Sequence, residues 1–267
     1  MRAGAGAAMT TVLLLGPCAV AAASPTSVDR ISVTGNGSTL SGTDGGGGGS
    51  LSWLHNFDPD SIVTLGGEHQ KLGPTHWNFG SLTGAVTRTI GDGRYTFSGE
   101  AHEGTGEDGV HPFKYHIDAA GVTGTYFHRL STLLEYRYID VETTHGHLPK
   151  FQLAYLWTPH WLTTVSYSQS AGGNLGTRLT ALRVDHYSPV VNLMAGGVYG
   201  QASATIIQVF FNSPGHILRE GYVGASKTFA RRTEVSLTGD FQNLSGTKRT
   251  TVTLGFIFRL GSLGAQH

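Results

Sequence analysis

The chain has almost no cysteine: Cys18 is the only one among its 267 residues. It falls inside residues 1–23, which have the layout of a cleaved secretory signal peptide. Pro17 precedes Cys18, whereas a lipid-bearing cysteine follows a small residue, so we do not expect a lipoprotein. The mature chain, residues 24–267, would then contain no disulfide, although it enters an oxidising compartment.

The signal-peptide prediction depends on three features of the N-terminus. Arg2 supplies the positive charge, a short apolar run follows it, and small residues at Ala21 and Ala23 form a cleavage site after Ala23. The apolar run is too short to span a bilayer.

Charge is also scarce and balanced. Only 13% of residues are charged, with 18 Lys and Arg against 18 Asp and Glu. A nucleic-acid partner would require a basic patch, so this composition argues against one, and against strong attachment to an acidic surface.

Long apolar runs and amphipathic helices are missing after the signal segment. What repeats instead is a segment of about ten residues in which apolar and polar side chains alternate, followed by a cluster of turn-forming residues. The clearest example is "RTTVTLGFIFRL", residues 249–260. Val252, Leu254, Phe256, Phe258 and Leu260 share one side of this segment, opposite Arg249, Thr251, Thr253, Gly255 and Arg259.

A soluble sandwich and a membrane barrel both show such alternation, and further features favour the barrel. Aromatic residues lie near segment ends on the apolar faces, as in the girdles of outer-membrane barrels: Trp53, Phe57, Phe151, Trp157, Trp161, Tyr167, Phe256 and Phe258. The last segment ends almost at the C-terminus. Short connections such as 58–60 also alternate with longer ones such as 103–109, which predicts periplasmic turns and extracellular loops.

The segments predict an all-β, single antiparallel transmembrane barrel of about fourteen strands. The count takes 111–127 and 190–211 as one long strand each, and 28–35 as a first strand. Residues 36–49 would then form a Gly-rich loop. Twelve strands is the alternative, if 28–47 is a disordered leader and one weak segment is no strand.

One pair of residues has the chemistry of a hydrolase. His186 and Ser188 are two positions apart, so a strand places them on the same side, as in the His-x-Ser of outer-membrane lipid A deacylases. The next acidic residue, Glu220, is too distant to complete that pattern. A strand-end histidine and a turn serine are the structural alternative.

His145 and His147, near Asp140 and Glu142, resemble a transition-metal pair. The chain has 13 histidines, so chance pairs are common. We expect no metal and no cofactor.

The polar faces of the predicted strands carry charges of both signs, which would line the lumen. Such residues brace the wall through cross-strand pairs or line a polar path for sugars and ions. The candidates are Lys114, His116, Asp118, Glu135, Arg137, Arg232, Glu234, Asp240, Arg249 and Arg259.

The signal "VLLLGPCAVAAAS" and the closing residues 232–260 resemble those of small Gram-negative outer-membrane β-barrels. In general style, including "TTVSYSQS" and the hairpin "YVGASKTFARRTEVSLTGDFQ", the chain is similar to YaiO-type barrels and others that accompany exopolysaccharide production. The tail "GSLGAQH" beyond the last aromatic departs from the usual barrel ending.

This resemblance implies a porin-like, non-enzymatic conduit or scaffold in the outer membrane, for exopolysaccharide export. Its partners would be outer-membrane lipid, polysaccharide and the export machinery. Two alternatives stay open: an outer-leaflet lipid hydrolase that uses His186 and Ser188, and a structural or surface-interaction barrel with a closed lumen.

Overall fold

The computed structural model of the protein describes residues 29–41, 45–58, 60–72, 75–91, 94–107, 112–141, 144–202, 216–229, 232–244 and 247–260. The predicted signal peptide lies outside these residues. The strands are β1 (Asp29–Leu40), β2 (Gly46–Asp58), β3 (Ser61–Leu72), β4 (Thr75–Ile90), β5 (Tyr95–Glu107), β6 (Pro112–Tyr126), β7 (Leu130–Val141), β8 (Thr144–Thr158), β9 (Trp161–Gln169), β10 (Ala171–Gly173), β11 (Arg178–His186), β12 (Asn192–Ala202), β13 (His216–Phe229), β14 (Thr233–Leu244) and β15 (Thr247–Leu260).

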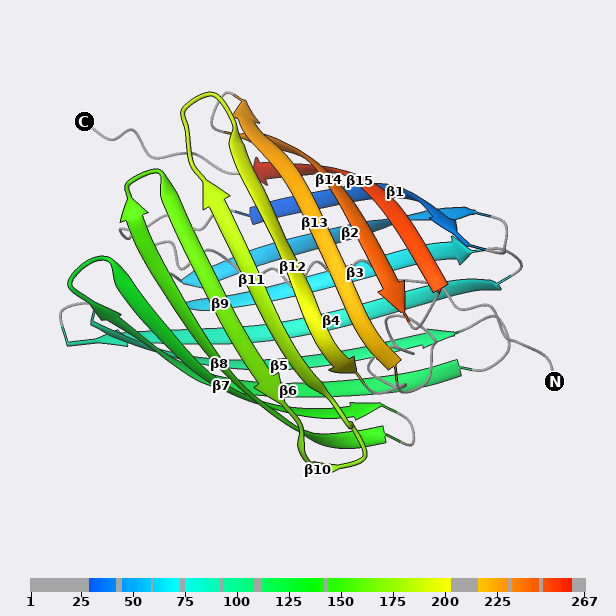
Figure 1. The fold of residues 1–267 in the computed structure, drawn as a ribbon, viewed down its shortest axis with the longest axis horizontal. Coiled ribbons are helices and arrows are strands. Elements are labelled where there is room, and N and C mark those ends of the chain that lie inside the picture. The colour runs from blue at the N-terminus through cyan, green and yellow to red at the C-terminus, as the bar shows by residue number, and fades with distance from the viewer. Residues whose placement is uncertain are drawn as a thin grey trace.

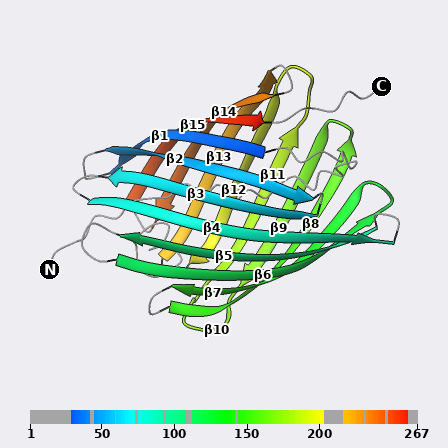
Figure 2. The same cartoon turned by 180° about the vertical axis from the view of Figure 1, so that it is seen from behind.

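These strands form one closed antiparallel barrel, as Figures 1 and 2 show from opposite sides. Each strand pairs with its neighbours in sequence, and β1 pairs with β15 over the full length of β1. The three-residue β10 continues the pairing of β9 along β8, where Lys150 faces Ser168 and His147 faces Ala171. β9 and β10 therefore fill one place in the wall, and the barrel has the predicted fourteen strands.

The two faces of the wall differ sharply in exposure. On β15, Thr251 is 1% exposed and Val252 is 52% exposed; on β14, Asp240 is 3% exposed and Phe241 is 55% exposed. Curvature crowds the side chains that point inward and spreads those that point outward. The inner face is therefore polar and the outer face apolar, as residues 249–260 predicted.

We call the end where β1 begins and β15 ends the proximal end, and the opposite end the distal end. At the proximal end Tyr126 accepts a hydrogen bond from the backbone N–H of Arg129 at 3.2 Å. Between them Phe127 and His128 have φ values of 52° and 57°. Two left-handed central residues are typical of the tight hairpin turns whose twist matches that of the flanking strands.

The predicted first strand is confirmed and is longer than expected, because the Gly-rich segment 36–49 is largely strand rather than loop. β1 continues to Leu40, and Asn36 and Gly37 face Gly48 and Gly47 on β2. Glycine permits this pairing because a side chain would collide with the adjoining backbone: a Cβ at Gly47 would lie 2.6 Å from the carbonyl oxygen of Asn36.

The single long strand predicted over 111–127 corresponds to β6. Of the strand predicted over 190–211, β12 covers 192–202, and 203–211 lie outside the described residues.

The expected alternation of short and long connections is only partly present. Some connections at the distal end are as short as the proximal connection 59–60, because the strands extend into the predicted loops. These short distal connections are 73–74, 142–143 and 245–246. No helix in the described part of the chain is long and apolar enough to cross a membrane.

Replacing Gly48 by Ala tests the close packing of the Gly-rich strands. A Cβ at this position would collide with the carbonyl oxygen of His69 and the side chain of Gln70. Because the backbone oxygen cannot move aside, we expect the free energy of unfolding to fall by about 2 kcal/mol, measured by urea unfolding of the refolded barrel. Gly37→Ala is the control, since nothing lies within 4 Å of its Cβ. Equal effects of the two substitutions would contradict the observed packing.

Candidate functional site

The inner face of the barrel changes character from the proximal to the distal end. The proximal half carries small hydroxyl side chains; for example, Thr34 on β1 and Ser50 on β2 hydrogen-bond at 2.7 Å. A band of charged residues follows, which we call the charged belt. The belt consists of Glu135, Arg137, Lys150, Arg183, Asp185, Glu220, Asp240 and Arg249.

On β7 and β8 the belt is held by one carboxylate between two cations. Arg137 donates from Nε to Oε1 of Glu135 at 2.6 Å, and the Lys150 Nζ lies 4.0 Å from the same oxygen. The two residues on β7 are neighbours on one face because strand side chains repeat every two positions. The cluster is only partly buried, so its charges border the lumen.

On β11 the belt contains a tighter ion pair. Arg183 Nε lies 2.9 Å from both carboxylate oxygens of Asp185, and Nη2 lies 2.6 Å from Oδ1. The side chains are 11% and 7% exposed. A fork of this kind fixes the guanidinium against the wall and neutralises it there.

The third part of the belt spans β13 to β15. Gln242 donates to Glu220 at 3.2 Å and accepts from Arg249 Nη1 at 3.4 Å. Tyr222 lies over Gly196 of β12, where a Cβ would come within 2.6 Å of the ring. Because Gly196 faces Arg183 in the register, the tyrosine bridges the space between this part of the belt and the ion pair on β11.

A second tyrosine is arranged in the same way on the opposite wall. Tyr115 of β6 lies over Gly104 of β5, and its hydroxyl is 3.2 Å from Nε2 of His102. Tyr115 is 6% exposed. Both tyrosines thus depend on a glycine of the neighbouring strand to lie flat along the inner wall.

Directly distal to the belt, the inner face becomes apolar on β6 to β13. We call this group the apolar collar; it consists of Ile117, Ile139, Leu148, Leu175, Leu179 and Leu218. Leu175 is fully buried, against Gly146 of β8. The sequence analysis missed the collar because it assigned every apolar face to the lipid. Along β6 and β7 the alternation reverses, so that Ile117 and Ile139 occupy inward positions. This reversal was the signal in the sequence that could have indicated the collar.

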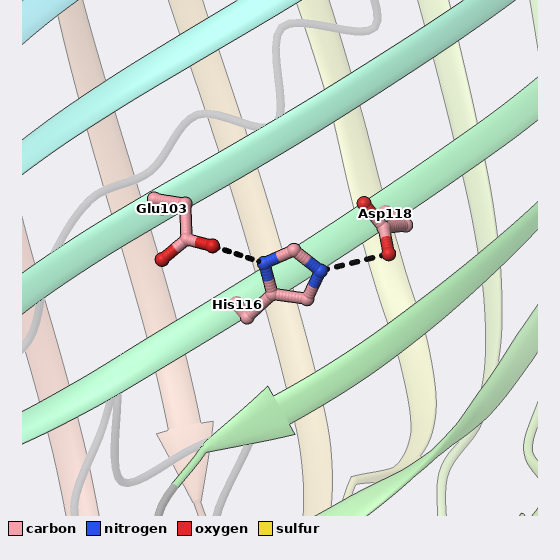
Figure 3. A network of polar contacts seen from close by, with 3 residues as sticks. All are labelled: Glu103, His116 and Asp118. Carbon is pink, nitrogen blue, oxygen red and sulfur yellow. Dashed lines mark hydrogen bonds and ion pairs between the residues drawn. The ribbon is translucent and has the colours of Figure 1, made fainter.

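The same reversal corrects three predicted lumen residues. Tyr115 and Ile117 point inward, so Lys114, His116 and Asp118 point outward. His116 Nδ1 lies 2.8 Å from Glu103 Oε1, and Nε2 lies 2.7 Å from Asp118 Oδ2 (Figure 3). Since carboxylate oxygens only accept, the two contacts favour the protonated ring, in which both nitrogens donate. This network braces the outer surface near the distal end.

The structure places the remaining lumen candidates at two levels. Glu135, Arg137, Asp240 and Arg249 belong to the charged belt. Glu234 and Arg259 point inward near the proximal end, where they form an ion pair at 3.3 Å. Arg232 lies outside the strands, in the proximal turn between β13 and β14, and is exposed.

The hydrolase candidates are not brought together. His186 points outward and packs its ring on Trp161, with centroids 4.5 Å apart. Ser188 Oγ donates to the carbonyl of Val191 at 2.7 Å and accepts from the backbone N–H groups of Val191 and Val190 at 3.0 and 3.3 Å. The hydroxyl therefore closes the turn after β11.

His145 and His147 both lie on the outer face of β8. The His147 ring stacks on Tyr136 at 5.3 Å, whereas His145 is exposed. Among the described residues no group of three His, Cys, Asp or Glu side chains is arranged to hold a metal ion.

No protein-family model matches the chain, and no curated protein matches it. Solved structures do match. A mutant of the TodX monoaromatic hydrocarbon channel is similar with a TM-score of 0.59 and 10% identity over 94% of each chain. The CymD monoaromatic hydrocarbon channel has a TM-score of 0.56 and 8% identity over 88% of each chain. A bacterial polysaccharide outer membrane secretin has a TM-score of 0.51 and 9% identity over 88% of this chain and 99% of its own.

At these identities the matches show the fold alone. Together with the two-faced wall, they define the class: the chain has the closed β-barrel fold of bacterial outer-membrane channels. None of these three structures is a YaiO-type barrel, so that finer resemblance stays a prediction.

Replacing Ser188 by Ala distinguishes the turn role from catalysis. Loss of its three hydrogen bonds should lower the free energy of unfolding by about 1 kcal/mol, measured by urea unfolding, while the acyl content of added lipid A stays constant. Ser98→Ala is the control, because its hydroxyl makes only a 3.5 Å contact with the carbonyl of Gly121. Acyl release that disappears in the Ser188 variant would restore the hydrolase hypothesis.

Proposed function

We propose that the protein is a non-enzymatic outer-membrane conduit for hydrated polar solutes, with polysaccharide leaving the cell as its physiological cargo. The observation that carries this proposal is the charged belt on the inner face of a wall whose outer face is apolar. In hydrocarbon all backbone groups must pair internally, and a closed barrel meets that demand. The polar inner face from the proximal end to the belt offers water a surface inside it.

The proposed orientation places the proximal end in the periplasm and the distal end outside the cell. Both termini of the barrel wall, the start of β1 and the end of β15, then lie on the periplasmic side, as is usual for bacterial barrels. Export by the predicted signal peptide agrees with this location.

The chemistry of the inner wall suits a sugar chain. Hydroxyl groups of the proximal half, such as those of Thr34 and Ser50, can exchange hydrogen bonds with sugar hydroxyls. The belt charges lie beside charges of the opposite sign, while Glu68 and Glu100 also point inward and add negative charge, so a neutral chain meets no large electrostatic barrier. The fold similarity to a polysaccharide outer membrane secretin supports the same cargo.

The apolar collar favours a second candidate, a channel for small apolar molecules. Ile117, Leu148 and Leu179 are partly exposed on the inner side, and such an aliphatic surface binds hydrocarbon better than sugar. Two of the similar structures are monoaromatic hydrocarbon channels.

Single-channel conductance of the refolded mature protein in a planar bilayer separates the two candidates. Steady conductance that is blocked by oligosaccharides of increasing size would support the polar conduit. A stable barrel without conductance that accelerates toluene entry into liposomes would favour the hydrocarbon channel. A barrel that does neither would overturn both and favour a structural role.

Arg137→Gln should shift the ion selectivity of the conducting barrel towards cations, on the order of twofold. The substitution leaves Glu135 with Lys150 alone at 4.0 Å and so raises the negative potential at the belt. The reversal potential in a salt gradient measures the shift. Arg88→Gln is the control, because Arg88 is exposed on the outer face of β4; an equal shift there would contradict a path along the belt.

A further inference from the structure

The outer face of β9 and β11 to β15 carries charge of one sign only. The acidic side chains on these strands are Asp185, Glu220, Glu234 and Asp240, and the register points all four inward. The charged side chains that point outward from the same strands are Arg178, Arg219, Lys227 and Lys248.

Three of these cations gather at the distal edge of the apolar surface. Arg219 faces Asn243, which faces Lys248, so the two cations share one row two strands apart, about 10 Å along the wall. Arg178 lies two strands to the other side of Arg219 and faces Gln201. Figure 1 shows the strands that carry them, β11, β13 and β15, on the near side of the barrel with β12 and β14 between them. We call Arg178, Arg219 and Lys248 the basic arc.

The arc lies directly above an aromatic row. The guanidinium carbon of Arg178 is 5.9 Å from the ring centroid of Tyr167, and that of Arg219 is 5.9 Å from the centroid of Tyr199. Rings of this kind mark the level at which hydrocarbon gives way to head groups. All three cations are exposed, and within the described part of the chain none forms an ion pair with a carboxylate.

The opposite wall lacks this pattern. On β5 to β8 the outer face at the distal end mixes signs, as in the Glu103, His116 and Asp118 network of Figure 3, with Lys114 on the same strand. Lys71 is the outward distal cation on the intervening strands β1 to β4, so the cluster of three cations, rather than positive charge as such, distinguishes β11 to β15 among the described residues.

We propose that the basic arc binds the phosphorylated sugar head group of an outer-leaflet lipid of the lipid A class. Three cations, each on the order of 10 Å from the next, match phosphates separated by a sugar better than one glycerophospholipid phosphate. The amides of Gln201 and Asn243 lie between the cations in the register, where sugar hydroxyls would meet them. The acyl chains then lie along the aromatic row and the apolar surface below. The inference rests on the proposed membrane location but not on conduction.

The test is a titration of the refolded barrel, in uncharged detergent, with diphosphoryl lipid A. Native mass spectrometry gives the dissociation constant. The triple variant Arg178→Gln, Arg219→Gln and Lys248→Gln should weaken binding on the order of 100-fold, and high salt should weaken wild-type binding. Dephosphorylated lipid A and phosphatidylglycerol should bind the wild type more weakly than diphosphoryl lipid A.

Two single variants serve as matched controls. Lys114→Gln removes an outward distal cation from β6, and Lys227→Gln removes one from the proximal end of β13. Both should bind lipid A within about twofold of the wild type. If the triple variant fails to refold, the single variants Arg178→Gln and Arg219→Gln replace it, each with an expected loss of about fivefold.

Unchanged binding in the arc variants, or an equal loss in Lys114→Gln, would overturn the proposal. Equal affinity for phosphatidylglycerol would also overturn it, because the sugar would then contribute nothing. Conductance is measured independently of lipid binding. A barrel that binds lipid A but does not conduct would support this inference and contradict the proposed conduit. A barrel that conducts but does not bind lipid A would support the conduit and contradict this inference.

Discussion

The closure of the hydrogen-bond ladder between the first and last strands, β1 and β15, is the constraint on which the rest of the structure depends. A sheet of this length would otherwise leave two edges of unpaired backbone groups. Closure makes every strand an interior strand and gives the wall an inside and an outside. Once that distinction exists, the period of two along each strand assigns every side chain to one side or the other.

Curvature then gives the two sides different energetics. Inward side chains are crowded, so glycines such as Gly104 and Gly196 make room for Tyr115 and Tyr222. Charges in this crowded layer meet partners on the same or the adjoining strand, as Arg183 and Asp185 do. Within the belt each charge lies beside one of opposite sign, which makes this part of the inner face polar without one strong sign.

The outer surface is not uniform around the barrel. On β9 and β11 to β15 every acidic side chain points inward and the outward charges are all cations, whereas the outer face around β5 to β8 carries His116 between two carboxylates. The inner surface is uneven as well, with the apolar collar lying distal to the belt on β6 to β13. At the distal end of β6 to β13 the pattern of the rest of the wall is therefore reversed, with aliphatic side chains inside and charged side chains outside.

Local sequence determined the two-faced strands, their number and the outward aromatic and aliphatic residues, because the period of two is a property of neighbouring residues. It also indicated Glu135, Arg137, Asp240 and Arg249 as inward residues. Only the tertiary structure decided the outward position of His116, the inward position of Ile117, the pairing of the Gly-rich strands and the separation of His186 from Ser188. These depend on register and on height relative to the apolar surface. Both are set by partners far away in the chain, so no local pattern could determine them.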